Sequence, residues 1–105
     1  MSVEEDLMLC RKYMALVDGA AARDIAFNLS LTALKNLRRS RKCFYTGKPF
    51  TEKDGLSIDR VDNSKGYEDG NVVACLTSLN TKKGNLSVEE ILALAKGIKK
   101  KIKEL

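Results

Sequence analysis

The stretch at residues 43–85, CFYTGKPFTEKDGLSIDRVDNSKGYEDGNVVACLTSLNTKKGN, decides the fold of this chain. Alternating apolar residues predict two short strands, and the run of Asp, Asn, Ser and Gly between them predicts a loop. The predicted order is strand, loop, strand and helix, at residues 56–61, 62–70, 71–75 and 77–83. This compact ββα unit holds the densest group of polar residues, so any chemistry is expected here.

Three helical segments are predicted ahead of the ββα unit. The first has apolar residues at helical spacing and is expected to end at Asp18-Gly19, with its buried stripe at positions 3, 7, 10, 14 and 17. The second is a short segment at residues 20–28 that places Ile25 and Phe27 in the core. The third is capped by Ser30 and reaches about Arg39, burying Leu31, Leu34 and Leu37.

Two further elements flank the unit closely. Phe44 and Tyr45 are predicted to form a short strand, followed by a turn at residues 46–49 in which Gly47 can take a positive φ. After the unit, Ser87 and Glu90 form a capping-box pattern at the start of a final amphipathic helix. Its expected buried stripe consists of Val88, Ile91, Leu92, Ala95, Ile98, Ile102 and Leu105.

The length and composition indicate one α+β domain. A chain of 105 residues is expected to form a single domain, with a helical part at 1–42, the ββα unit at 43–86 and the last helix at 87–105. No apolar run approaches the roughly 20 residues of a membrane span, and the acidic start MSVEEDLMLC is unlike a signal peptide. We therefore expect a cytoplasmic protein whose three cysteines are reduced.

The positive charge is clustered next to the ββα unit. The formal net charge is +5, and basic residues stand just before the unit and at its end, at Arg38, Arg39, Arg41, Lys42, Lys82 and Lys83. Such blocks predict binding to a polyanion, for example double-stranded DNA. The last helix is also rich in lysine, but its lysines are equally well explained as a solvated face that suits the helix dipole.

The sequence SIDRVDNSKGYEDGNVVACLTSLNTKKGNL, preceded by CFYTG, resembles the HNH endonucleases, especially the small members encoded by bacteriophages. The similarity covers about residues 43–86 and lies in the order and spacing of several elements. These are an acidic residue at the first strand's end, Gly-Asn-Val-Val at the second strand, and Asn-x-x-Lys on the helix. The resemblance implies a ββα-metal finger that hydrolyses DNA phosphodiester bonds with one divalent cation, in the host cytoplasm if the chain is phage-encoded.

The resemblance also implies roles for individual residues. Asp59 stands where the family has a metal-binding Asp, and Asn80 stands where many members supply a second metal contact. Asn71 matches the central Asn that braces the loop, and Lys83 matches a Lys one turn beyond Asn80. Carboxylate and amide oxygens are hard ligands, so Mg²⁺ or Mn²⁺ is the expected cofactor.

Two departures from the family pattern matter. The general-base His is replaced by Arg60, which stays protonated and cannot accept a proton, although it can bind a phosphate. Asp62 is a candidate substitute base. The cysteine pairs that hold zinc in many members are also incomplete, so no zinc is expected; Leu76 and Leu79 should fill that space by packing. Cys43 is then expected in the core, and Cys75 on the other side of its strand.

Two functions follow from this pattern. The first is a divergent, Mg²⁺-dependent HNH-type endonuclease, with Arg60, Asp62, Asn71 and Lys83 in its catalytic group. The second is a protein without catalytic activity that uses the same fold to bind nucleic acid or a host protein as a regulator. The loss of the His argues against conventional catalysis, and no residue distinguishes DNA from RNA.

Overall fold

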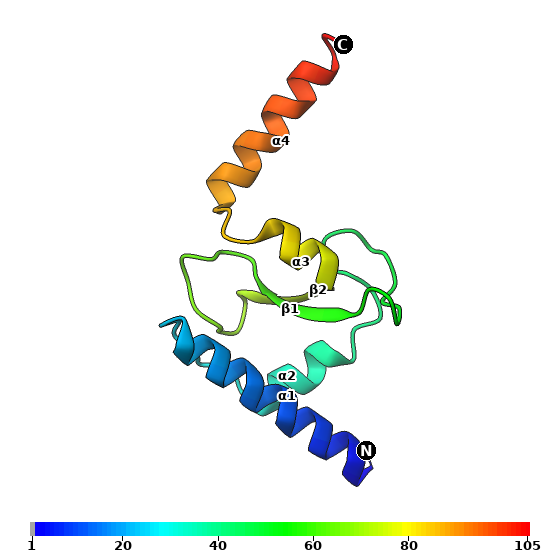
Figure 1. Ribbon diagram of the computed structural model, residues 1–105, viewed down its shortest axis with the longest axis vertical. Coiled ribbons are helices and arrows are strands. Elements are labelled where there is room, and N and C mark those ends of the chain that lie inside the picture. The colour runs from blue at the N-terminus through cyan, green and yellow to red at the C-terminus, as the bar shows by residue number, and fades with distance from the viewer. Residues whose placement is uncertain (1) are drawn as a thin grey trace.

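The computed structural model describes residues 2–105 and has an α+β fold, with four helices and one small sheet (Figure 1). Two helices precede the sheet and two follow it. In chain order the elements are α1 (Val3–Ala22), α2 (Leu31–Arg38), β1 (Leu56–Arg60), β2 (Val72–Leu76), α3 (Thr77–Lys83) and α4 (Val88–Ile102). The ββα order is therefore present, and each strand lies within one residue of its predicted bounds.

The sheet is an antiparallel hairpin with a long connecting loop. β1 and β2 pair in a register that places Leu56 opposite Leu76 and Arg60 opposite Val72. The short helix α3 packs on both strands, while α2 contacts β2 from the other side and rests on α1 (Figure 1). The hairpin is thus held between α3 and the α1–α2 pair.

α1 is longer than predicted, and its buried face is a different one. Asp18-Gly19 does not end the helix, which runs to Ala22, and the segment at residues 23–30 is not helical. Two helices, not three, therefore precede the sheet. The helix continues in spite of the helix cost of Gly19, about 1 kcal/mol, and the extension buries Ala20 completely.

The buried stripe predicted for α1 is wrong, because a different set of its residues packs against the core. Val3, Leu7 and Met14 are exposed, whereas Leu9 and Ala20 are buried and Tyr13 and Leu16 pack against the core. The two stripes lie on neighbouring faces of the same helix, so spacing alone does not distinguish them. Tyr13 fixes the choice, since its hydroxyl donates a hydrogen bond of 2.7 Å to the Leu29 carbonyl.

The main core lies between α1, α2, the loop and the hairpin. Ser30 caps α2 as predicted, and Leu34 is fully buried, but Leu31 is exposed, which corrects its prediction. The partly buried Ile25 and Phe27 pack on the core as expected. The loop enters the core through Tyr67, whose ring lies 5.7 Å from that of Phe27. Tyr67 is thereby a loop anchor and not an exposed stacking platform.

A second, smaller core lies around Cys43, Cys75 and Leu76. Cys43 and Leu76 are buried there, and Leu79 packs against them, as predicted. Cys75 is in the same cluster, so the expectation that it faces away is wrong. Residues 44–46 form a turn and not the predicted strand, and Gly47 has a φ of 73°.

α4 projects away from the rest of the molecule (Figure 1). Its capping box is present, with Ser87 and Glu90 each accepting a hydrogen bond from the other's backbone N–H. No residue of α4 is buried, so the predicted buried stripe of this helix is wrong. The hairpin is already contacted by α3 on one side and by α2 on the other. The chain is therefore elongated, with extents of 56 × 30 × 20 Å.

Candidate functional site

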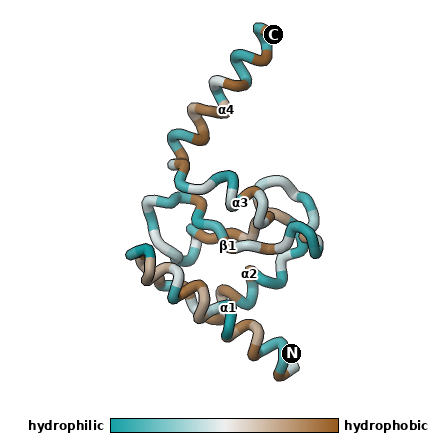
Figure 2. The backbone as a smooth tube through the Cα atoms, viewed as in Figure 1, coloured by the Kyte–Doolittle hydropathy of each residue, from teal (hydrophilic) through white to brown (hydrophobic). Residues whose placement is uncertain are grey.

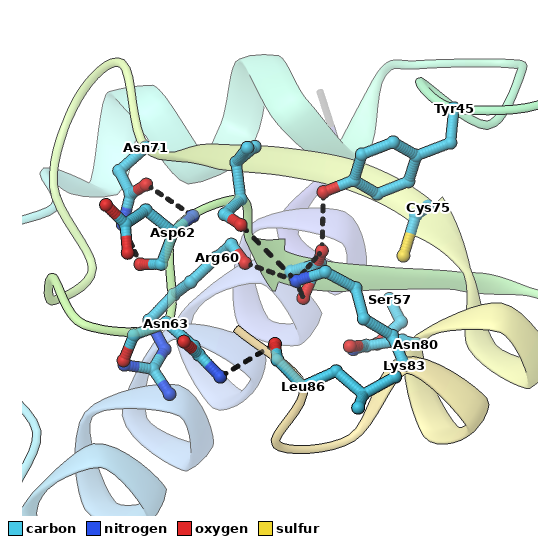
Figure 3. Close-up of polar contacts among 12 residues, drawn as sticks. Tyr45, Ser57, Arg60, Asp62, Asn63, Asn71, Cys75, Asn80, Lys83 and Leu86 are labelled. Carbon is cyan, nitrogen blue, oxygen red and sulfur yellow. Dashed lines mark hydrogen bonds and ion pairs between the residues drawn. The ribbon is translucent and has the colours of Figure 1, made fainter. Parts of the chain in front are cut away.

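Asp59, one of the two residues expected to bind metal, lies in a polar corner with Tyr45 and Lys83, whose side chains Figure 3 shows. Asp59 lies near the end of β1 and is only 7% exposed. Its Oδ2 accepts a hydrogen bond of 2.7 Å from the Tyr45 hydroxyl. Lys83, in the last turn of α3, brings its Nζ to 3.1 Å from Oδ2 and 3.3 Å from Oδ1. Both carboxylate oxygens of Asp59 therefore have partners within the chain.

The Lys83 ammonium is surrounded by oxygen atoms. Besides the Asp59 carboxylate, it donates to the Arg60 carbonyl at 2.8 Å and lies 3.5 Å from the Val61 carbonyl. The two charged side chains are only 11% and 8% exposed. A buried carboxylate needs a compensating cation, and Lys83 supplies one.

Tyr45 completes the corner as a hydrogen-bond donor. Burial, the hydrogen bond to Asp59 and the negative charge of Asp59 all raise the pKa of Tyr45 well above its ordinary value. The hydroxyl therefore keeps its proton at any physiological pH. The sequence did not single out Tyr45 as a site residue, because its role depends on the turn at residues 44–46, which was predicted as a strand.

Asn80 lies close to this corner but bonds elsewhere. Its Nδ2 donates to the Ser57 hydroxyl at 2.7 Å and to the Ile58 carbonyl at 3.4 Å. Asn80 and Asp59 nevertheless line one small polar cavity of about 80 Å³, together with Lys83 and Arg60. The structure thus brings the two predicted metal ligands to one place.

As arranged, these residues do not fit a divalent cation. Mg²⁺ needs oxygen ligands at about 2.0–2.1 Å, whereas both oxygens of Asp59 are engaged by Tyr45 and Lys83. The ammonium of Lys83 would also repel a second cation in the same corner. Among residues 2–105, no three Asp, Glu or Cys side chains gather as a metal-binding group. The metal role of Asp59 and Asn80 stays a prediction.

Arg60 points toward the loop between the strands. Its Nη1 donates to the Asn63 carbonyl at 3.0 Å and the Lys65 carbonyl at 2.8 Å. Its guanidinium also lies 5.5 Å from the centre of the Tyr67 ring, a cation–π distance. Arg60 therefore stabilises the loop between the strands.

Asn71 and Asp62 hold the same loop. Asn71 accepts from the Asp62 backbone N–H at 2.9 Å and donates to the carbonyls of Asp62 and Gly66 at 3.0 and 2.9 Å, so the expected bracing role is confirmed. The Asp62 carboxylate accepts from the hydroxyl and N–H of Ser64. These hydrogen bonds lower the pKa of Asp62, which makes it a weaker base.

A basic groove leads to the polar cavity from the side of α1 and α2. Its volume is about 370 Å³, and it contains Lys12, Arg23 and Arg38 but none of the described acidic residues. Asn80 and Tyr67 line both the groove and the cavity. Of the basic residues predicted to bind nucleic acid, Arg38 lines the groove and Lys83 the cavity. The others line neither, namely Arg39, Arg41, Lys42 and Lys82.

Lys12 and Arg23 were missed from the sequence. They lie in the first part of the chain, where acidic and basic residues are nearly equal in number. They therefore belong to no basic cluster in the sequence. Lys12 lies on α1 and Arg23 is the C-cap residue that follows it, 11 positions or about three helical turns further along. That spacing is the signal that could have identified them.

The sequence is similar to an uncharacterized 29.0 kDa protein encoded in the dda-modA intergenic region of Enterobacteria phage T4, with 37% identity over 76 residues. The matched residues are 70% of this chain, but the chain spans only about a third of the relative's length, 31%. No protein-family profile matches the sequence, and no solved structure matches it. Within residues 2–105, every helix is too short or too polar to cross a membrane.

Proposed function

We propose that this protein binds double-stranded DNA through the groove between α1, α2 and β1, without cutting it. In this proposal the ββα unit is an HNH-like finger in which the Lys83 ammonium takes the position of the divalent cation. The observation that carries the proposal is the contact of one ammonium with Asp59 and two backbone carbonyls, in the corner where the family resemblance expects a metal.

The charges along the groove support a phosphate-binding role. Lys12 and Arg38 take part in no ion pair within residues 2–105, so both are available to a ligand. Arg23 donates to the Tyr67 hydroxyl at 2.8 Å, which holds its guanidinium at the junction of groove and cavity. No acidic residue lines the groove beside these three cations, so the groove should attract a polyanion, and Arg and Lys bind phosphate oxygens directly.

Salt dependence is the test of this proposal. Fluorescence anisotropy with a labelled duplex should show affinity that falls steeply with salt, because each phosphate contact releases counterions. Lys12→Ala and Arg38→Ala should each weaken binding and reduce the slope of log affinity against log salt by about 0.9. Lys53→Ala, an exposed lysine away from the groove, is the matched control. Equal effects in all three variants, or affinity that salt does not change, would contradict the proposal.

The divergent endonuclease is the second candidate. It is favoured by one observation, the presence of Asp59 and Asn80 on the same cavity at the end of the basic groove. In this reading a cation displaces Lys83 when DNA is bound. Supercoiled plasmid incubated with Mg²⁺ or Mn²⁺ should then be nicked by the native protein and not by Asp59→Asn. Cleavage that survives in Asp59→Asn rules this candidate out and indicates a contaminating nuclease.

The phage T4 relative supports an origin in a bacteriophage, where a DNA-binding protein of this size would act in the host cytoplasm. A host protein is the remaining partner class from the sequence. It gains support if the native protein shows no affinity for duplex or single-stranded nucleic acid at low salt.

A further inference from the structure

The apolar side chains of α4 form a stripe that no other part of residues 2–105 buries, with Val88 and Ile91 partly exposed and the rest exposed. Leu92, Ile98 and Ile102 are 63%, 50% and 61% exposed, far more than is usual for large aliphatic residues. The helix stands clear of the rest of the molecule, with hydrophobic and hydrophilic residues alternating along it (Figure 2). A stripe of this size on one helix marks an interaction surface.

The spacing of the stripe is that of a coiled coil. Apolar residues recur at alternating intervals of three and four, at Val88, Ile91, Ala95, Ile98, Ile102 and Leu105. This repeat of 3.5 residues forms the narrow seam through which two helices pair. Leu92 and Leu94 widen the seam at its start. Gly97, the weakest helix former in α4, lies outside the seam.

The charges of α4 specify the direction of pairing. Glu89 and Glu90 lie in the first turn, whereas the second half carries four lysines and the C-cap is a fifth, namely Lys96, Lys99, Lys100, Lys101 and Lys103. Parallel pairing would bring the lysines of two copies side by side, which is unfavourable. Antiparallel pairing brings the acidic turn of each helix to the basic end of the other and also opposes the helix dipoles favourably.

The antiparallel arrangement gives a complete register of apolar layers. Ile91 of one helix faces Ile102 of the other and Ala95 faces Ile98, while Val88 faces Leu105, which follows the last helical residue Ile102. All six seam positions are filled without a polar residue. Near the ends, the aliphatic parts of Lys99 and Lys101 can cover the leucines of the partner helix.

We propose that α4 is a dimerisation helix that pairs in antiparallel orientation with α4 of a second copy of this chain. The surface is separate from the basic groove, so this proposal holds whether or not the protein binds DNA. The seam spans fewer than three heptads, so the dimer should dissociate on dilution within the micromolar to millimolar range.

Sedimentation equilibrium over a concentration series tests self-association. The native chain should change from monomer to dimer, and Ile98→Gln should raise the dissociation constant at least about tenfold, because two isoleucines are lost per dimer. Lys100→Gln, two residues along on the outer face, should change it little. A native chain that stays monomeric at millimolar concentration, or equal effects of both variants, would overturn the proposal.

Disulfide trapping tests the orientation. In a Cys10→Ser background, Val88→Cys and Leu105→Cys variants should form a disulfide-linked heterodimer when mixed under mild oxidation. Neither variant alone should form a linked homodimer, since like positions lie at opposite ends of the pair. Efficient homodimer formation by Val88→Cys alone would show parallel pairing and would overturn the antiparallel assignment. The native fold of each variant is checked by circular dichroism before oxidation.

Discussion

The Asp59 corner and the apolar stripe of α4 are two regions where the sequence predicts a missing partner. For Asp59 the expected partner was a divalent cation, and for α4 it was the core of the domain. Asp59 is buried and paired with Lys83 inside the chain, while no residue of α4 is buried. A sequence pattern shows that a group needs a partner, but not whether that partner belongs to the same molecule.

The comparison also separates two kinds of stabilisation. The Asp59 corner combines charge, burial and hydrogen bonds from two neighbouring elements, so its parts depend on one another. α4 depends on its own backbone hydrogen bonds, on its capping box and on a partner molecule that covers its apolar stripe. Substitutions should therefore have large effects in the corner and small effects on the isolated chain in α4.

Removing Lys83 should have the largest effect. Lys83→Met leaves Asp59 buried without its cation, and we expect the free energy of unfolding to fall by about 3–5 kcal/mol in urea denaturation. Lys82→Met, one residue away and exposed, is the control and should change it by less than about 0.5 kcal/mol. Adding Asp59→Asn to Lys83→Met should recover part of the loss. Equal stability of the two single variants would show that the corner is not closed by Lys83.

Removing Asn71 should have an intermediate effect and extend the comparison to the loop. Asn71→Ala loses three hydrogen bonds and leaves backbone groups of Asp62 and Gly66 without partners. We expect a loss of about 1–3 kcal/mol in the free energy of unfolding. Asn36→Ala, an exposed Asn on α2 that bonds only through its backbone, serves as the control. A loss no larger than that of the control would contradict the bracing role.

Substitutions in the α4 stripe should barely affect the dilute chain. At concentrations where the protein is a monomer, Ile98→Ala should change the free energy of unfolding by less than about 0.5 kcal/mol, because the side chain is already exposed. Urea denaturation followed by tyrosine fluorescence measures this. A loss of several kcal/mol in the monomer would mean that α4 packs against the rest of the chain after all.

Acid should weaken the start of α4. The backbone N–H and hydroxyl of Ser87 lower the pKa of Glu90, so its carboxylate is stabilised in the folded helix. A lowered folded-state pKa gives stability that is present above the unfolded pKa and lost as the pH falls through the folded value. Helical circular dichroism should therefore fall below about pH 4.3, the unperturbed pKa of Glu. In Glu90→Gln the part of this acid-induced loss of helical signal that comes from Glu90 should be absent, and the part that comes from other groups should remain.

The ββα unit was predictable because its signals are local. Gly84 closes α3 and Ser87 starts α4 in the structure as in the sequence, since caps depend on residues only a few positions apart. The role of Asn71 also followed from the pattern. The buried face of α1 did not, because Leu7 and Leu9 are equally apolar and only tertiary contact decides between them. The pairing of Lys83 with Asp59 joins residues 24 positions apart, which no local signal reports.

Manganese binding tests the central claim most directly, because Mn²⁺ has a paramagnetic signal that is lost when it binds. Electron paramagnetic resonance titration of the native protein should show no site that depends on Asp59, since Lys83 already neutralises its carboxylate. The same titration with Asp59→Asn gives the background. Binding of one Mn²⁺ per native chain that disappears in Asp59→Asn would contradict the account and restore Asp59 as a metal ligand.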